Sequence, residues 1–180
     1  MPGRGSFPFL FYFSLPPPLC AQCAQRLTPR GTTHAATHRL KDDCHATNWV
    51  AFIIEDRSLL LQGEGQGGLP DLAMTMTEYA ISRGRPTVVF GGFRVFGIDV
   101  RGGNTSRRAK FAFFTAVPSD TPVRARASAG MQKGNVLSIL KGAHIELDVP
   151  SVGEITPEAV EAKLRSVGGA HQPQRFEFIG

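Results

Sequence analysis

The chain has 180 residues, which suits one domain with or without a tail, and its hydrophobic fraction of 42% is ordinary for a globular core. Its net charge of +5 permits nucleic acid, anionic lipid or an acidic protein as a partner and does not choose among them. Three cysteines are too few for a disulfide-dense framework.

Residues 1–32 differ in composition from the rest of the chain. The apolar run at 7–15, followed by small residues near Cys20, imitates a secretory signal peptide. The run is too short to span a bilayer, and Pro8 and Pro16–Pro18 would break a helix. We favour a disordered leader, or sequence translated upstream of the true start, and no other segment resembles a membrane span.

One spacing near the start imitates a zinc finger. The pattern C-x2-C-x10-H-x3-H joins Cys20, Cys23, His34 and His38. Zinc fingers with two cysteines and two histidines use a longer central spacer, about 12 residues. The intervening AQRLTPRGTT offers Leu27 and a helix-breaking Pro29, which cannot build the small core of a finger. We therefore expect no metal site, and the sequence indicates no other cofactor.

From residue 33 the pattern becomes that of a folded domain. THAATHRLKDD (33–43) predicts a short helix. Three of its residues should face the core: Ala35, Ala36 and Leu40. NWVAFII (48–54) predicts a strand, and SLLLQ (58–62) predicts a second strand that forms a hairpin with it. The glycine-rich GEGQGG (63–68) predicts a loop, and the Gly-Lys-Ser/Thr of a phosphate-binding loop does not follow it.

The middle of the chain predicts one helix and two long strands. Pro70 suits the first turn of a helix. Apolar residues recur around it at helical spacing: Leu69, Leu72, Ala73, Met76 and Ala80. TVVFGGFRVFGIDV (87–100) and FAFFTAV (111–117) are apolar in both alternation registers. Strands of this kind are covered on both faces, as in a sheet between two helix layers.

EITPEAVEAKLRSVGG (154–169) predicts the last helix. Thr156 is the expected N-cap, Pro157 takes the first helical position, and Gly168 ends the helix. The apolar stripe consists of Val160, Leu164 and Val167. The predicted order is therefore helix, hairpin, helix, two long strands, helix, strand and helix.

This order predicts an α/β (α+β) fold. We expect one domain over residues 33–172, with a central mixed sheet of five or six strands, mostly antiparallel, and helices on both faces. Residues 1–32 are then a leader or extension, and residues 173–180 a C-terminal tail.

Positive charge is concentrated in residues 101–133. This stretch holds seven cations against one acid, Asp120. The cations are Arg101, Arg107, Arg108, Lys110, Arg124, Arg126 and Lys133. Most of them fall in two clusters on either side of the apolar run at 111–117. Two clusters of one sign indicate a docking surface for an acidic partner.

Several stretches resemble the actin-depolymerising-factor homology (ADF/cofilin) family, and within it the coactosin-like proteins. They are LKDDCHATNWVAF (40–52), SRRAKFAF (106–113), TPVRARASAGMQKGNVLSILKG (121–142), HIEL (144–147) and AKLRSVGGA (162–170). The resemblance covers about residues 33–172, and it lies in the order and spacing of the stretches rather than in any single motif. It implies the ADF-homology fold, with 121–142 as the long actin-binding helix and 106–113 as a basic turn leading into the fourth strand.

The resemblance also implies a function. It implies an actin-binding protein without enzymatic activity, in the cytoplasm and cytoskeleton, that binds the side of actin filaments and regulates their dynamics as a monomer. The implied contact residues are Lys110, Arg107, Arg108, Arg124, Arg126 and Lys133. Lys110 matches the basic residue that coactosins use on filaments, and Arg124 and Arg126 match a basic pair in cofilins. Two residues apart on a helix, that pair diverges by about 200°.

Alternatives remain open at this level. A cofilin-type depolymerising or severing factor needs a short free N-terminus, whereas 32 extra residues precede this domain. A nucleic-acid-binding module would need exposed aromatic residues for stacking, but Phe111, Phe113 and Phe114 look buried. Anionic phosphoinositide lipid is a possible competitor at the basic patch. For an enzyme, we find no nucleophile, base and orienting acid at a recognisable spacing.

Overall fold

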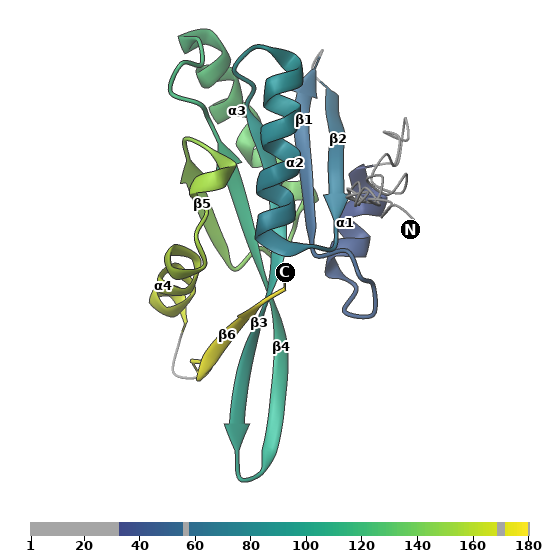
Figure 1. Cartoon of the computed structure of the whole chain (residues 1–180), viewed down its shortest axis with the longest axis vertical. Coiled ribbons are helices and arrows are strands. Elements are labelled where there is room, and N and C mark those ends of the chain that lie inside the picture. Colours follow the sequence, from purple (N-terminus) through teal and green to yellow (C-terminus); the bar gives the residue numbers. More distant parts are fainter. Residues whose placement is uncertain (1–32, 56–57, 169–171, 180) are drawn as a thin grey trace, which may run out of the picture.

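The computed structural model describes residues 33–55, 58–168 and 172–179, and Figure 1 shows them as a mixed sheet flanked by helices. The strands are β1 (Trp49–Glu55), β2 (Ser58–Gly65), β3 (Val89–Arg101), β4 (Asn104–Ala116), β5 (Ile145–Val149) and β6 (Arg175–Phe178). The helices are α1 (Thr33–Lys41), α2 (Gly68–Arg83), α3 (Val123–Ile139), the 3-10 turn η1 (Val152–Glu154) and α4 (Pro157–Val167). None of the helices in these ranges is both long and apolar enough to cross a membrane.

The sheet is mostly antiparallel, as predicted. Its strand order is β2-β1-β3-β4-β5, and β6 pairs with β3. Every pairing is antiparallel except that of β4 with β5. The predicted leader 1–32, with its apolar run, lies outside the described residues, so its expected lack of structure stays a prediction.

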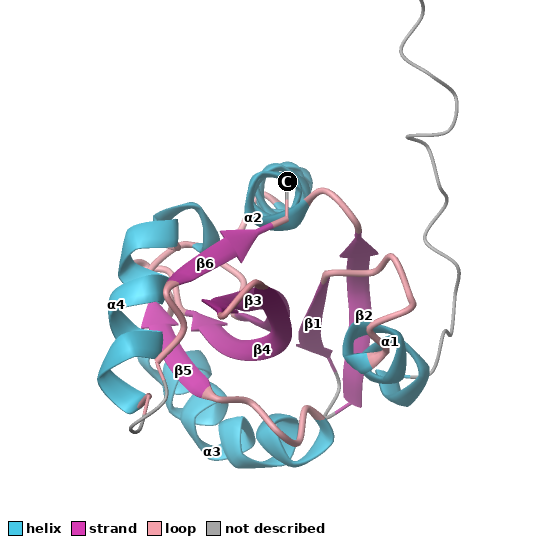
Figure 2. Ribbon diagram, turned by 90° about the horizontal axis from the view of Figure 1, so that it is seen from below, coloured by secondary structure: helices cyan, strands magenta, loops and turns pink. Residues whose placement is uncertain are grey.

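Helices cover both faces of the sheet, and Figure 2 shows them arranged around it. Side chains of α2 and α4 share one core with Trp49, Phe93 and Phe114. Side chains of α1 and α3 share the other core with Phe52 and Phe113. We call the two sides of the sheet the α2/α4 face and the α1/α3 face. The strands that are apolar on both sides are thus covered on both sides.

The capping signals of α4 are confirmed. The Thr156 hydroxyl accepts a hydrogen bond from the backbone N–H of Ala159 at 3.3 Å, and Pro157 opens the helix. Val160 and Leu164 are buried, but Val167 is 55% exposed, so the predicted stripe ends one turn early. In α2 the inward position near the helix end belongs to Tyr79, because Ala80 is exposed.

The predicted loop at 63–68 is wrong in its first half, since β2 continues to Gly65. The glycines serve close packing there. A Cβ at Gly65 would lie 2.3 Å from Asp71 Oδ2 and 2.6 Å from the Trp49 ring. The indole N–H of Trp49 donates to that same carboxylate oxygen at 2.8 Å. The glycine run therefore makes room for a hydrogen-bonded core tryptophan.

Strands β3 and β4 form a long hairpin that projects beyond the rest of the sheet (Figure 1). Their register runs from Val89 opposite Ala116 to Arg101 opposite Asn104. Gly102 and Gly103 close the hairpin with positive φ angles of 55° and 84°, which suits a two-residue turn matched to strand twist. We call residues 95–110 the β3–β4 arm.

Strand β6 was not predicted. Its Arg175–Phe178 lies beside β3, with Phe178 opposite Val95 and Phe176 opposite Gly97. The expected tail 173–180 therefore contains a strand that completes the base of the arm. Phe176 and Phe178 pack against the α2/α4 core.

Candidate functional site

The first basic cluster lies within a strand, not in a turn as the resemblance implied. Arg107, Arg108 and Lys110 are residues of β4, opposite Ile98, Gly97 and Val95 of β3. The turn itself is Gly102–Gly103, several residues earlier. The strand begins at Asn104, well before the apolar run, because β4 pairs with β3 along its whole length. The cations are consequently fixed on a paired backbone.

Alternation along the strand divides this cluster between the two faces of the sheet. Lys110 and Arg108 share a face with the buried Val95 and Ala112, which belong to the α2/α4 core. Arg107 lies on the other face, together with Phe96. The three cations therefore form a rim around one strand rather than a single flat patch.

Arg107 is engaged within the molecule. Its guanidinium carbon lies 3.4 Å from the centroid of the Phe96 ring, a cation–π contact. Its Nη2 also lies 3.4 Å from a carboxylate oxygen of Glu177 on β6. Its charge is thus partly compensated, which reduces what it can offer to a partner.

Arg108 and Lys110 are free of such contacts. Neither has an ion-pair partner within the described ranges. Arg108 is exposed and Lys110 is half-buried. Among the residues of this cluster, they carry the uncompensated positive charge.

His144 lies beside Lys110 at the point where β5 approaches β4. Its ring Nδ1 accepts a hydrogen bond from the backbone N–H of Phe111 at 3.1 Å, and the backbone N–H of His144 donates to the Phe111 carbonyl at 2.7 Å. Burial, and next the charge of Lys110, lower the pKa of the imidazole below its usual value, although the hydrogen bond to Phe111 acts in the other direction. The ring is therefore held as a neutral acceptor at the base of the arm.

The outer edge of β4 is open along the arm. Strand β5 pairs with β4 only from Ala112 to Ala116. In the part of the chain that the structure describes, Asn104–Lys110 have β3 on one side and no strand on the other. The backbone and the three cations of this stretch are accessible from that side.

The second cluster divides over two sides of α3. Arg126, Ala129, Lys133 and Val136 recur at intervals of three and four residues, and Ala129 and Val136 are buried against the sheet. Arg124 precedes Arg126 by two residues and so points away from the sheet. Met131 follows Arg124 by seven residues, about 20° away, and is 76% exposed. Arg124 and Met131 therefore share the outward face of α3, whereas Arg126 belongs to the inward face.

Lys133 is neutralised by neighbouring acids. Its ammonium lies 2.8 Å from Asp148 and 3.3 Å from Glu146, both on β5. Burial lowers the pKa of Lys133, but the hydrogen bonds and charges of these carboxylates outweigh burial and raise it. The sequence could not show this pairing, because the acids come from the next strand.

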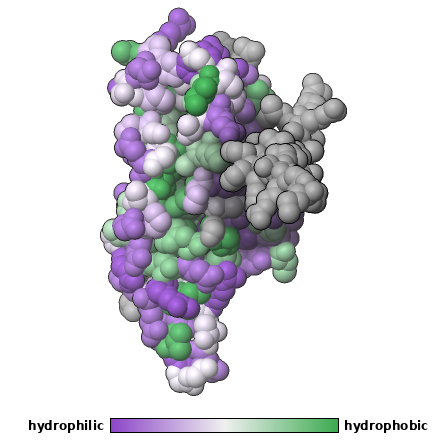
Figure 3. Space-filling model, in the orientation of Figure 1, coloured by the Kyte–Doolittle hydropathy of each residue, from purple (hydrophilic) through white to green (hydrophobic). Residues whose placement is uncertain are grey.

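The two clusters lie toward opposite ends of the molecule. Strand β4 carries the first, and the chain enters α3 beyond the far end of that strand (Figure 1). Six residues of strand separate Lys110 from Ala116, or about 20 Å. Figure 3 shows that the arm surface is largely hydrophilic or neutral, whereas apolar residues gather above it, between α2 and α4. The candidate site therefore extends along the molecule, from the β3–β4 arm to α3.

Sequence reasoning missed the exposed apolar residues of α3. Val123 is 84% exposed and Met131 is 76% exposed, and both lie near the cations of this helix. An apolar residue outside the helical stripe is the signal that could have found them. Met and Arg are both enriched at protein interfaces relative to the rest of a protein surface.

The described residues contain no group of three or more His, Cys, Asp or Glu that could hold a metal ion. Cys20 and Cys23 of the imitated zinc finger lie outside those residues, so the metal prediction is untested. Cys44, which the sequence leaves without a role, is a free, exposed thiol.

Comparison with known proteins identifies the family of the chain. The chain matches the family of cofilin/tropomyosin-type actin-binding proteins over residues 29–165. Coactosin of Dictyostelium discoideum is 26% identical over 137 residues, which cover 76% of this chain and 87% of that protein. The crystal structure of coactosin from Entamoeba histolytica superposes with a TM-score of 0.61 at 22% identity, covering 76% of this chain and 94% of the other.

The solution structure of mouse coactosin, an actin filament binding protein, has a TM-score of 0.52 at 22% identity, over 77% of this chain and 89% of the other. At these identities the solved structures establish the fold, while the family match spans most of the domain. The chain therefore belongs to the cofilin/tropomyosin-type actin-binding family and is a coactosin-like actin-binding protein.

Proposed function

We propose that this protein binds the side of actin filaments, without catalysing a reaction, and thereby regulates filament dynamics. Its contact surface runs from the β3–β4 arm to the outward face of α3. It acts as a monomer in the cytoplasm, associated with the cytoskeleton.

The observation that carries the proposal is the uncompensated charge of Arg108 and Lys110 on a projecting, paired strand. Their Cβ directions are fixed by the sheet, so less side-chain freedom is lost when a partner binds. Actin is acidic, and complementary charge raises both the association rate and the specificity of a complex. The mouse coactosin described as a filament binder has the same fold, which supports this mode over a monomer-binding one.

The outward face of α3 supplies the second contact. Arg124 and Met131 pair a cation with an exposed apolar side chain, the combination typical of interface anchors. Lys133 should contribute less to actin binding than the sequence implied, because Asp148 and Glu146 already neutralise it. Arg107 should also contribute less, because Glu177 partly compensates its charge.

Nucleic acid is disfavoured as the partner. Phe113 and Phe114 are 1% and 0% exposed, so they offer no platform for base stacking. A phosphoinositide headgroup would meet the same free cations as actin, and we propose that it competes at the arm.

The proposal is tested by cosedimentation with actin filaments at two salt concentrations. Lys110→Ala should weaken binding at least about tenfold, since truncating a charge buried at an interface typically costs about 2–5 kcal/mol. Arg108→Ala should weaken it less and mainly at low salt, and Arg107→Ala least of all. Arg85→Ala removes an exposed cation just after α2, outside the proposed surface, and is the control.

A different outcome would change the assignment. If Lys110→Ala pellets with filaments like the wild type while Arg124 and Arg126 are essential, a cofilin-type depolymerising mode replaces the coactosin-type one.

A further inference from the structure

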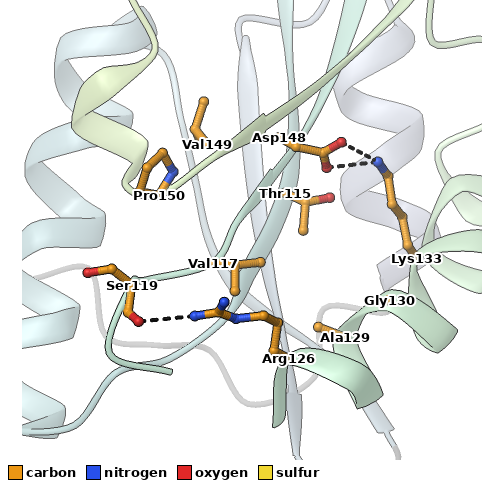
Figure 4. A pocket seen from close by; sticks show the side chains of 10 residues that line it. All are labelled: Thr115, Val117, Ser119, Arg126, Ala129, Gly130, Lys133, Asp148, Val149 and Pro150. Carbon is orange, nitrogen blue, oxygen red and sulfur yellow. Dashed lines mark hydrogen bonds and ion pairs between the residues drawn. The ribbon is translucent and has the colours of Figure 1, made fainter. Parts of the chain in front are cut away.

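A surface cavity of about 570 Å³ lies beneath the first half of α3, where this helix passes the ends of β4 and β5 (Figure 4). Cavities of roughly 300–1,000 Å³ are the size that holds small organic molecules. None of the contacts proposed for the filament requires this space, because Arg124 and Met131 point away from it.

The walls of the cavity are largely apolar. Val117, Ala129, Val149 and Pro150 contribute to its lining. Gly130 stands at the helix side, and a Cβ built there would meet no other atom within 4 Å. The cavity can therefore take up an apolar body, and a larger side chain at position 130 has room to fill it.

One cation of the lining is available to a ligand. Arg126 donates from Nη2 to the Ser119 carbonyl at 3.0 Å and has no acidic partner among the residues that the structure describes. A guanidinium has five N–H donors, so most of them remain free. The other cation, Lys133, is held by Asp148 at the opposite end of the cavity, as the dashed lines in Figure 4 show. The lining therefore has one positive charge, that of Arg126, free to pair with an anion.

A second, independent feature points to a ligand. Thr115 is 4% exposed, and its hydroxyl has no hydrogen-bond partner within the described ranges. Figure 4 shows this hydroxyl on the side of Thr115 that faces Lys133. A buried hydroxyl without a partner destabilises a protein, whereas valine of the same shape would avoid that cost. Because Thr115 lines the cavity, a bound ligand would supply the missing hydrogen-bond partner of its hydroxyl.

We propose that this cavity binds a small amphipathic carboxylate. The carboxylate pairs with the planar fork of Arg126, the apolar body covers Val117 and Ala129, and a polar atom of the ligand reaches the Thr115 hydroxyl. A monoanion matches the single uncompensated charge of the lining, and guanidinium and carboxylate match in bidentate geometry. The site stands without any assumption about filament binding, since it is tested in the absence of actin.

The test is a titration of the full ¹⁵N-labelled chain with 4-phenylbutyrate, followed by amide chemical shifts. We expect saturable shifts at Thr115, Ala129 and Val149. The neutral amide 4-phenylbutyramide has the same apolar body and should bind roughly tenfold more weakly, because it cannot form the charged pair. Absence of saturable shifts at the cavity, or equal binding of the amide, would overturn the proposal.

Variants locate the ligand. Arg126→Gln should raise the Kd for 4-phenylbutyrate roughly tenfold, whereas Arg124→Gln, which removes the same charge from the outward face of α3, should leave it unchanged. Gly130→Leu should abolish binding by filling the cavity. Thr115→Val should weaken binding while raising the melting temperature, a combination that loss of folding cannot mimic. If Arg124→Gln weakens binding as much as Arg126→Gln, the ligand lies elsewhere.

Discussion

Replacing Arg94 by leucine should cost about 2–4 kcal/mol of folding free energy, although Arg94 is not one of the proposed contact residues. Its side chain is 3% exposed and lies in the middle of β3. The guanidinium donates to the carbonyls of Asp42 at 2.6 Å and His45 at 2.7 Å, and more weakly to Leu40 at 3.4 Å. It thereby anchors the end of α1 and the turn that follows.

The magnitude follows from the two short hydrogen bonds. A buried acceptor that loses its partner costs about 1–3 kcal/mol, and the lower half of that range applies to each, since both contacts are part-buried. The domain should still fold, because typical stabilities are about 5–15 kcal/mol. Arg94→Lys should fall between leucine and the wild type, since one ammonium cannot reproduce the fork that reaches both carbonyls.

Urea denaturation measures the effect. The midpoint should fall for Arg94→Leu while the m-value stays constant. Arg39→Leu is the control, because Arg39 makes an exposed ion pair with Glu64 at 2.8 Å that should contribute less than about 1 kcal/mol. A loss below about 1 kcal/mol for Arg94→Leu at unchanged m-value would refute the assigned anchoring role.

Two further predictions concern stability. Gly134→Ala should stabilise the protein by about 1 kcal/mol, measured as a higher urea midpoint, because Gly134 lies within α3 and a Cβ there would meet nothing within 4 Å; an unchanged or lower midpoint would contradict the helical geometry of this stretch. The lowered pKa of His144 predicts that its contribution to stability is complete above pH 6.5, its usual value, and is lost as the pH falls through the folded-state value. His144→Asn keeps a hydrogen-bond acceptor that does not titrate. Between pH 7.5 and pH 5.5 the melting temperature of this variant should therefore fall less than that of the wild type. Equal falls would exclude the histidine as the cause.

The sequence predicted those parts of the fold whose signals are local. Thr156 and Pro157 mark the start of α4 because a cap acts on its own helix. The apolar runs of β1, β3 and β4 stand out because helices cover both faces of the sheet. The order of elements follows directly from such signals, and with it the mixed sheet.

The features that were missed depend on distant partners. Strand β6 has four residues and becomes a strand only beside β3, where Phe178 meets Val95. Arg94 reads as an interruption of an apolar run until the end of α1 is placed next to it. Val167 and Ala80 follow the helical spacing, yet no element within the described ranges covers them.

The candidate site shows the same division. The sequence located the cations of both clusters, but their availability depends on contacts it could not show. Lys133 is neutralised by two acids from β5, and Arg107 by a stacked ring and an acid from β6. Arg108, Lys110 and Arg124 remain for the expected role, which the comparisons leave untested.

The open edge of β4 has a consequence for solubility. An unpaired strand edge is a template on which a second copy of the same strand can add, and cationic side chains are one device that keeps two such edges apart. Arg107, Arg108 and Lys110 lie along that edge, so removing them together also removes the mutual repulsion between arms. A chain that loses all three would self-associate and sediment without actin, and in a pelleting assay that sediment would count as binding. The cations that we propose as contacts for a partner would then also keep the protein in solution.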